Sequence, residues 1–204
     1  MLTKYIARQF GKPTGIGGIL STFIMNNLNR KQYKAVLGNI DVQANDAILD
    51  IGFGNGYMIK RLLKKNPKKM YGIEISQDML TKVSRKNSSA LSAERLDLQQ
   101  ADIKDLPYEN SLFDKIYTIN TLYFWSDTDK SFSEIKRTLK PDGIFMNVIY
   151  TKEWLDKILY TQYGFSKYSV EQIVDMTENS GLKVIQIIEI QPNVSFCIIA
   201  KNVV

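Results

Sequence analysis

The fold is decided by one short stretch, which reads Ile48-Leu49-Asp50-Ile51-Gly52-Phe53-Gly54-Asn55-Gly56-Tyr57. An apolar strand there leads directly into three glycines at alternate positions, and a helical pattern follows. Glycine lacks a Cβ atom, so the chain can turn tightly and its backbone can approach a nucleotide-like ligand. A tight strand-to-helix turn that binds no ligand is the alternative interpretation.

The next two expected strands each end at an acidic residue. Residues 69–75 read as a second strand that ends at Glu74, where a carboxylate can accept hydrogen bonds from both hydroxyls of a ribose. Residues 95–101 read as a third strand that is followed directly by Asp102 and Ile103. Strands that alternate with helical segments predict an α/β domain with a mainly parallel sheet.

The second half of the chain supplies four more strands. Residues 112–119 read as the fourth, and residues 144–150 as the fifth, after the turn Leu139-Lys140-Pro141-Asp142-Gly143. Residues 183–191 and 194–201 are two β-rich runs with a two-residue connection. Because a connection this short joins antiparallel strands, we expect a C-terminal hairpin.

With these motifs in place, the sequence resembles a class I S-adenosylmethionine-dependent methyltransferase, similar to the small-molecule ubiquinone and menaquinone biosynthesis methyltransferases. The resemblance runs from about Asp46 to the C-terminus. Its most specific parts are the glycine turn 49–56, Gly72-Ile73-Glu74-Ile75-Ser76, Gln100-Ala101-Asp102 and the turn 139–143.

The resemblance implies a doubly wound, seven-stranded, mostly parallel sheet with an antiparallel last strand, the Rossmann-like methyltransferase fold. Residues 1–40 would form an N-terminal helical cap or lid, and residues 41–204 the methyltransferase domain. The implied cofactor is S-adenosyl-L-methionine, with S-adenosyl-L-homocysteine as the product.

The resemblance also implies which residues bind the methionine part of the cofactor. Gly52, Gly54 and Gly56 would line it, and Asp50 would orient the turn or the amino group through water. Asn120, at the end of the fourth strand, would offer its backbone carbonyl or side chain to the ammonium.

For the nucleoside part, the resemblance assigns residues that follow the second and third strands. Glu74 would accept from the ribose hydroxyls, and Ile75 and Met79 would sandwich the adenine. Asp102 would accept from the adenine amino group, while the Ile103 N–H would donate to a ring nitrogen. For each acidic residue, a helix cap or a surface charge is the alternative role.

A nicotinamide-dependent dehydrogenase is the main rival with a glycine-rich turn. Its fingerprint requires the third glycine one position later, where this chain has Tyr57. The chain also leaves no room for a separate substrate domain. A second class of function is a nucleotide-cofactor-binding protein without catalysis.

Composition limits the chemistry that is available. The 204 residues are 44% apolar, which suits one compact domain. The single cysteine, Cys197, lies among apolar residues and is expected to be a buried packing residue, in keeping with a reducing cytoplasm. The chain has no histidine, which removes the usual general base and zinc ligand, and we expect no metal site.

The expected reaction is direct in-line displacement onto N or O, because methyl transfer from a sulfonium depends mainly on positioning.

A net charge of +6 and a pI near 9.2 require a test for nucleic-acid binding. Six Lys and Arg residues cluster within residues 60–69, on a helix whose other side carries Ile59, Leu62 and Leu63, so a solvated helix face explains them. The fourth strand exits into residues 120–125, which lack the Asn/Asp-Pro-Pro-aromatic step of many nucleic-acid methyltransferases. We therefore expect a small-molecule acceptor, with an RNA methyltransferase as the alternative.

The N-terminal forty residues superficially resemble a signal peptide, but asparagines stand where a cleavage site belongs. The apolar run 16–25 is too short to span a bilayer. Its helical spacing predicts a helix that docks on the domain. Tyr5, Phe10 and residues 15–18 are lid and hinge candidates, and an ordinary packing helix is the alternative. Flanking Lys and Arg residues also permit peripheral contact with a membrane.

Aromatic residues are the candidates for the acceptor side of the site. In the resembling family, the exit of the fourth strand and the segment after the fifth strand commonly form the acceptor pocket. The candidates are Tyr5, Tyr123, Trp125, Tyr150 and Tyr163. At least one aromatic residue of 123–125 is expected to be core. A helix follows, predicted by the capping box Ser169 to Gln172 and ended by Gly181.

Overall fold

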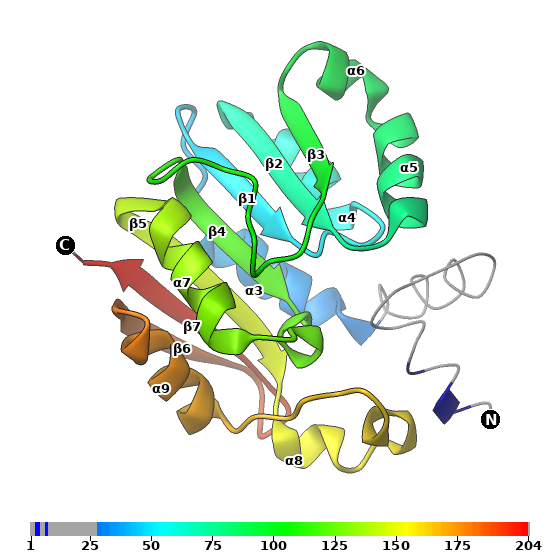
Figure 1. Ribbon diagram of the computed structural model, residues 1–204, viewed down its shortest axis with the longest axis vertical. Coiled ribbons are helices and arrows are strands. Elements are labelled where there is room, and N and C mark those ends of the chain that lie inside the picture. The colour runs from blue at the N-terminus through cyan, green and yellow to red at the C-terminus, as the bar shows by residue number, and fades with distance from the viewer. Residues whose placement is uncertain (1–2, 5–6, 8–27, 204) are drawn as a thin grey trace.

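The computed structural model describes residues 3–4, 7 and 28–203, and its centre is a seven-stranded sheet (Figure 1). The strands are β1 (Ala47–Ile51), β2 (Lys69–Glu74), β3 (Leu96–Gln100), β4 (Phe113–Ile119), β5 (Leu139–Tyr150), β6 (Leu182–Gln191) and β7 (Ser195–Asn202). Their order in the sheet is β3-β2-β1-β4-β5-β7-β6. Strands β1 to β5 run parallel, and β7 lies antiparallel between β5 and β6. The predicted sheet, including its antiparallel last strand and C-terminal hairpin, is confirmed.

Helices cover both faces of the sheet. The described helices are α3 (Arg30–Asn39), α4 (Tyr57–Leu63), α5 (Gln77–Lys86), α6 (Ser88–Ser92), α7 (Thr128–Thr138), α8 (Lys152–Leu155) and α9 (Val170–Asn179), with 3-10 turns η1 (Leu122–Phe124) and η2 (Leu159–Gln162). Figure 1 shows α7 and α9 in front of the sheet and α3 behind it. A sheet covered on both sides needs strands that are apolar on both sides, which explains the fully buried run of β1.

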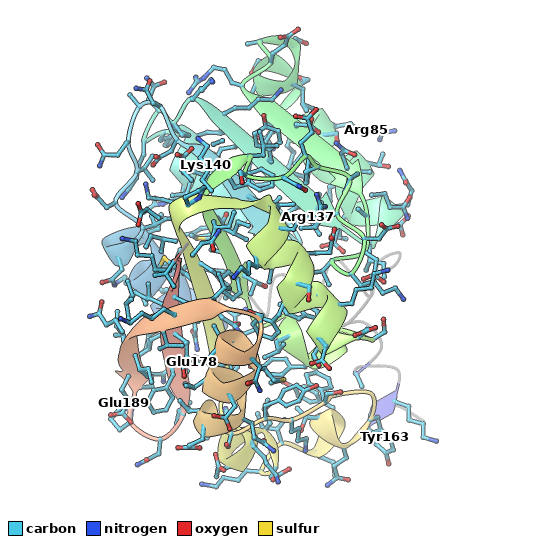
Figure 2. The ribbon with its side chains drawn as sticks, turned by 60° about the vertical axis from the view of Figure 1, so that its left-hand side comes forward. Arg85, Arg137, Lys140, Tyr163, Glu178 and Glu189 are labelled. Carbon is cyan, nitrogen blue, oxygen red and sulfur yellow. The ribbon has the colours of Figure 1, made fainter. Side chains whose placement is uncertain are left out.

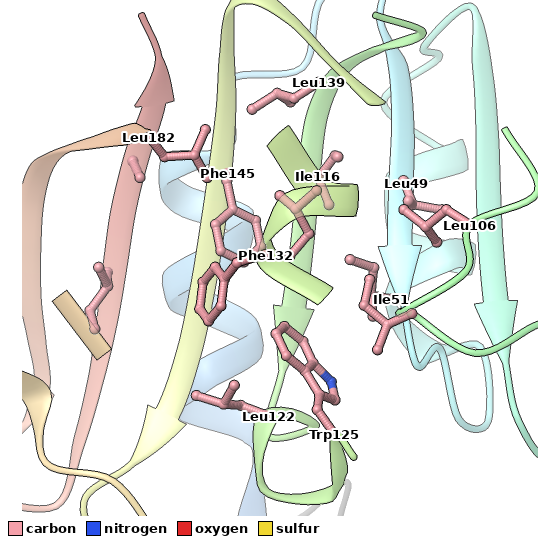
Figure 3. Close-up of a cluster of buried hydrophobic side chains, with 14 of the residues drawn as sticks. Leu49, Ile51, Leu106, Ile116, Leu122, Trp125, Phe132, Leu139, Phe145 and Leu182 are labelled. Carbon is pink, nitrogen blue, oxygen red and sulfur yellow. The ribbon is translucent and has the colours of Figure 1, made fainter. Parts of the chain in front are cut away.

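The core therefore has two layers, one on each face of the sheet. In the layer under α7 and α9, the Phe132 ring meets the Phe145 ring edge-on at 6.1 Å, beside Ile116 of β4 (Figure 3). In the other layer, α3 and α4 pack Val36 and Ile59 against the sheet, together with Cys197 of β7. Cys197 is fully buried, as predicted, and burial raises its pKa to about 12.

The start of β5 differs from the prediction. The expected turn 139–143 belongs to the strand, and Leu139 already pairs with Phe113. Ile144 pairs with Lys115, so four residues of β5 stand opposite one residue of β4 and form a bulge. Pro141 has no N–H for the ladder and Asp142 has a φ of 63°, which is why these residues leave the regular pairing.

The helix after the acceptor-side segment follows the prediction closely. The Ser169 side chain accepts the N–H of Gln172, and the Gln172 side chain accepts the N–H of Ser169, which completes the capping box of α9. Gly181 has a φ of +84° just past the end of the helix, as expected for a terminating glycine.

The predicted N-terminal cap is described only in part. Tyr5, Phe10, residues 15–18 and most of the expected helix over 16–28 lie outside the described residues. The described part of residues 1–40 centres on α3, which packs Val36 and Ile40 on the sheet and contacts β4, β5, β6 and β7. Across residues 28–203, together with residues 3, 4 and 7, no helix is both long and apolar enough to cross a membrane.

Candidate functional site

A pocket with a volume of about 60 Å³ opens at the carboxyl ends of β1 and β4, and the empty space is about 460 Å³ when the open solvent at its mouth is counted. Strands β2 and β3 lie on one side of β1, and β4 and β5 lie on the other, so the strand order reverses between β1 and β4. Open α/β sheets bind ligands in the crevice that such a reversal creates. The lining residues are Asn29, Tyr33, Asp50, Gly52, Phe53, Gly54, Asn55, Tyr57, Met58 and Ile119.

The three glycines of the turn after β1 all have positive φ values, but they serve different purposes. A Cβ atom on Gly52 would lie 2.6 Å from Thr121 Cγ2, and one on Gly56 would lie 2.7 Å from Val83 Cγ1. A Cβ atom on Gly54 would meet nothing within 4 Å. Gly52 and Gly56 therefore permit close packing, whereas Gly54 leaves its backbone open to the pocket.

Asp50 contributes a buried carboxylate to the pocket wall. Its side chain is 4% exposed, and Oδ2 has no hydrogen-bond partner among the described residues. Burial raises its pKa to about 7, and the nearby charge of Glu74 adds to this, while the Tyr117 hydroxyl opposes it. An orphaned carboxylate oxygen fits the ammonium group of an amino-acid ligand, which would supply both charge and hydrogen bonds.

The Glu74 carboxylate, at the end of β2, forms hydrogen bonds with both the glycine turn after β1 and the loop after β2. Its Oε1 accepts the N–H of Ser76 at 2.9 Å, and its Oε2 accepts the N–H of Gly54 at 3.0 Å. Burial raises the pKa of Glu74, and these N–H groups act in the opposite direction. Because each carboxylate oxygen has two acceptor positions, Glu74 keeps capacity for a further donor.

The residues expected to sandwich an adenine lie in unlike environments. Ile75 is 42% exposed and presents its side chain at the carboxyl end of β2. Met79 is 1% exposed and packs in the interior, with its N–H directed at the Ser76 hydroxyl. In this structure, Ile75 is the member of the pair that offers surface to a ligand.

Asp102 and Ile103 follow β3, at the same end of the sheet. Asp102 is partly exposed, and its carboxylate accepts the Lys104 N–H at 3.2 Å while Lys104 Nζ lies 3.8 Å from it. Ile103 is 5% exposed and belongs to the core. Neither residue lines the pocket, and neither do Glu74 and Ile75, so the pocket corresponds to the half of the predicted site built by β1 and β4.

Asn120 joins the end of β4 to the N-terminal part of the chain. It has a φ of 58°, and its Nδ2 donates to Asn29 Oδ1 at 3.0 Å. The Tyr123 hydroxyl lies 3.1 Å from Asn120 Oδ1. The Tyr150 hydroxyl donates to the Leu28 carbonyl at 3.1 Å and so reaches the start of α3. This network fixes α3 against the carboxyl ends of β4 and β5.

The structure separates the acceptor-side candidates. Tyr123 and Trp125 are buried, and the Trp125 Nε1 donates to the Thr121 hydroxyl at 3.2 Å, so both are core residues rather than pocket lining. Tyr163 lies at the periphery (Figure 2), 37% exposed, and its ring centroid is 5.4 Å from Lys4 Nζ. Tyr5 lies outside the described residues. Of the candidates, Tyr150 alone contacts a residue that lines the pocket, through its hydroxyl 3.4 Å from Asn29 Oδ1, among the residues described.

The sequence did not predict that residues from α3 and α4 would line the pocket together. Tyr33 of α3 stacks on Tyr57 of α4, with ring centroids 4.8 Å apart and an interplanar angle of 27°. Both rings line the pocket, as does Asn29. An aromatic residue directly after the third glycine was the one local signal. The contact itself joins segments 24 residues apart, which periodicity does not reveal.

Comparisons with known proteins agree with this geometry. Residues 49–147 match the family described as "Methyltransferase domain". The uncharacterized methyltransferase YdaC of Bacillus subtilis (strain 168) is 29% identical over 126 residues, which cover 61% of this chain and 67% of YdaC. YrhH of the same strain, also named as a methyltransferase, is 30% identical over 128 residues, covering 62% of this chain and 70% of YrhH.

A solved structure extends the likeness to the fold. The SAM-dependent methyltransferase from Aquifex aeolicus superposes with a TM-score of 0.72 at 22% identity, covering 87% of this chain and 93% of that one. The glycine turn, Asp50 and Glu74 all lie at the carboxyl ends of parallel strands, the end at which open α/β sheets bind ligands. The chain therefore belongs to the class I S-adenosylmethionine-dependent methyltransferases.

Proposed function

We propose that this methyltransferase transfers the methyl group of S-adenosylmethionine to N or O of a small molecule by direct in-line displacement. The observation that supports it best is the pocket at the ends of β1 and β4, which is lined by Gly54 and by Asp50, a buried acid with one oxygen that has no hydrogen-bond partner in the described part of the chain. This arrangement suits the amino-acid tail of the cofactor. In this proposal the reacting end of the ligand lies against α3.

The proposed cofactor contacts follow from this placement. Gly52, Gly54 and Gly56 surround the methionine part, Asp50 binds its ammonium group, and the Asn120 carbonyl supports that contact. The nucleoside part extends along the carboxyl ends of β2 and β3, where the proposed contacts are Glu74 to the ribose, Ile75 to the adenine ring, and Asp102 and the Ile103 N–H to its edge. The buried Met79 is proposed to support the ring site from the interior.

The chain's own contribution to the reaction is positioning. When bound, S-adenosylmethionine supplies a methyl group already activated by the sulfonium. Side chains from α3 and α4 then exclude water and hold the acceptor in line, and positioning of this kind can lower a barrier by about 7 kcal/mol or more. We propose that residues 1–40 act as the cap over this pocket. Because the chain has no histidine, a neutral amine or an acidic hydroxyl is the acceptor that needs least help.

Relatives support two acceptor classes. The 27-O-demethylrifamycin SV methyltransferase of Amycolatopsis mediterranei (strain S699) is 29% identical over 106 residues, and this chain spans 39% of it. The tRNA U34 carboxymethyltransferase of Campylobacter lari is 26% identical over 147 residues, and this chain spans 47% of it. A pocket lined by the stacked rings of Tyr33 and Tyr57 supports the small molecule, and the RNA methyltransferase is the second candidate. The single buried thiol fits work in a reducing cytoplasm.

Calorimetry with S-adenosylhomocysteine and with NAD tests the cofactor. We expect binding of S-adenosylhomocysteine and none of NAD, and the reverse result would overturn the proposal. Transfer of labelled methyl groups from S-adenosylmethionine to pools of small amines and phenols, and to total RNA, then tests the acceptor. Labelled small molecules with unlabelled RNA support the proposal. Label in RNA alone would establish the second candidate, and cofactor binding without transfer to either pool would indicate a protein without catalysis.

A further inference from the structure

Helices α3 and α4, on one face of the sheet, are strongly basic, whereas on the other face α9 is acidic and α7 is mixed, with two acidic and three basic residues. Helix α3 contains Arg30, Lys31 and Lys34 and no acidic residue. Helix α4 and the turn after it contain Lys60, Arg61, Lys64 and Lys65, again without an acidic residue. On the opposite face, α9 contains three acidic residues and no basic one, including Glu178 (Figure 2). We call the seven Lys and Arg residues of α3 and α4 the basic face.

The basic face is one continuous surface. Tyr33 of α3 stacks on Tyr57 of α4 at one end, and Lys65 Nζ donates to the Leu37 carbonyl at 2.9 Å at the other, so the two helices lie side by side. Both helices pack their apolar sides on the same face of the sheet. All seven charged side chains are exposed, on the side away from the sheet.

These charges are not neutralised within the protein. None of the seven forms an ion pair with a carboxylate from residues 28–203 or from residues 3, 4 and 7. Other lysines do form such pairs, for example Lys115 with Asp46 and Lys201 with Asp142. A concentrated, unpaired positive surface attracts a partner that presents many negative charges.

Two observations indicate which polyanion fits. Five of the seven residues are lysines, which act as point charges and lack the planar fork with which arginine reads nucleic acids. The exposed ring on this face, Tyr57, is already occupied, because Tyr33 stacks on it and Arg61 lies 5.9 Å from its centroid. A base would therefore find no free ring on which to stack. A layer of anionic phospholipid headgroups requires neither an arginine fork nor a free aromatic ring, because lysine charge alone attracts it.

We propose that the basic face docks this methyltransferase on a membrane surface rich in anionic phospholipid. Clusters of four to eight Lys and Arg residues on amphipathic helices are sufficient for such binding. The pocket is lined by Tyr33 and Tyr57, which belong to the same two helices as the basic face, so docking brings the pocket close to the lipid surface. An apolar acceptor dissolved in the membrane would then reach the pocket directly. The docking itself does not depend on the proposed acceptor.

Co-sedimentation of the full chain with phospholipid vesicles tests the proposal. We expect binding to phosphatidylcholine vesicles that contain phosphatidylserine, weakening as salt is raised, and no binding to pure phosphatidylcholine vesicles. The variant K34E/K64E should reduce the partition coefficient by about tenfold or more. The matched variant K130E/K157E makes the same change in net charge on exposed residues of α7 and of the segment after α8, outside the basic face, and it should bind as the wild type does.

Three outcomes would overturn the proposal: no binding to phosphatidylserine vesicles, equal losses in both variants, or binding to total tRNA at a salt concentration where the vesicles stay unbound. Each variant is first checked for an unchanged melting temperature and S-adenosylhomocysteine affinity. If K34E/K64E is unstable, K34Q/K64Q provides the same comparison with a smaller expected loss.

Discussion

The Glu74 carboxylate accepts the Gly54 N–H at 3.0 Å and thereby joins the end of β2 to the glycine turn after β1. The same side chain accepts the Ser76 N–H, at the start of α5. One buried acid therefore shapes both loops that border the proposed nucleoside site, in addition to any direct contact it makes with a ribose.

Replacing Glu74 tests both roles together. Glu74→Ala should weaken S-adenosylhomocysteine binding by one to two orders of magnitude, or about 1 to 3 kcal/mol, because two backbone donors and the ribose lose their acceptor. Calorimetry measures the dissociation constant. Glu178→Ala, an exposed acid on α9, should leave it unchanged. An unchanged constant for Glu74→Ala would remove this residue from the site.

Alanine at Gly52 and at Gly54 should have different effects. At Gly52 the new Cβ would lie 2.6 Å from Thr121, so we expect a large fall in melting temperature. At Gly54 it meets no protein atom, so the cost is about 1 kcal/mol for the positive φ alone. Gly54→Ala should nevertheless weaken S-adenosylhomocysteine binding, since its Cβ enters the ligand space. Thermal melts and titrations of both variants separate the two effects. Ligand affinity that survives in Gly54→Ala would place the ligand elsewhere.

Asp50 should make the stability of the ligand-free protein depend on pH. Burial raises its pKa from 3.8 to about 7, so the folded state holds a proton that the unfolded state releases between these values. The stabilising contribution is complete below about pH 4 and is lost as the pH rises to about 7, by up to about 1.4 kcal/mol per pH unit.

Urea unfolding of the wild type and of Asp50→Asn at several pH values measures this contribution. The free energy of unfolding of the wild type should fall relative to that of Asp50→Asn as the pH rises through this window. Asp175→Asn, an exposed substitution on α9, should show no such trend. Parallel pH profiles for the wild type and Asp50→Asn would show that the Asp50 pKa is ordinary.

Tyr123 should matter for stability more than for ligand binding. Its hydroxyl lies 3.1 Å from Asn120 Oδ1 and accepts the Tyr150 N–H, and it does not line the pocket. Tyr123→Phe should lower the free energy of unfolding by about 1 to 3 kcal/mol, because buried partners lose their hydrogen bonds. S-adenosylhomocysteine affinity should change little. Tyr163→Phe, on the exposed ring, serves as the control for both measurements. A large loss of affinity without loss of stability would show that Tyr123 belongs to the ligand site.

The parts of the fold that local chemistry determines could be predicted from the sequence. The glycine turn, the acid Glu74 that ends β2, and the capping box of α9 each depend on neighbouring residues, and all lie where expected. The bulge in β5 was missed, because Pro141 and Gly143 favour a turn in isolation and only pairing with β4 draws them into the sheet.

Long-range contacts explain the rest of the difference. The sequence pattern at 123–125 suggested aromatic residues that face a ligand. In the structure, Phe132 packs on Trp125, and the Tyr123 hydroxyl accepts the Tyr150 N–H. The pocket residues Asn29 and Tyr33 gave no local signal, because their partners Asn120 and Tyr57 lie far along the chain. Secondary-structure patterns locate the helices and strands, whereas the residues that line a pocket depend on which of these elements become neighbours in the fold.

The hydrogen bond between Asn29 and Asn120 bears on how this protein can be shortened or fused. A cut at residue 40 looks natural from the sequence, yet it would delete one side of the pocket and leave the amide at the end of β4 without its partner. Truncations and linkers intended to preserve ligand binding should therefore start upstream of Leu28.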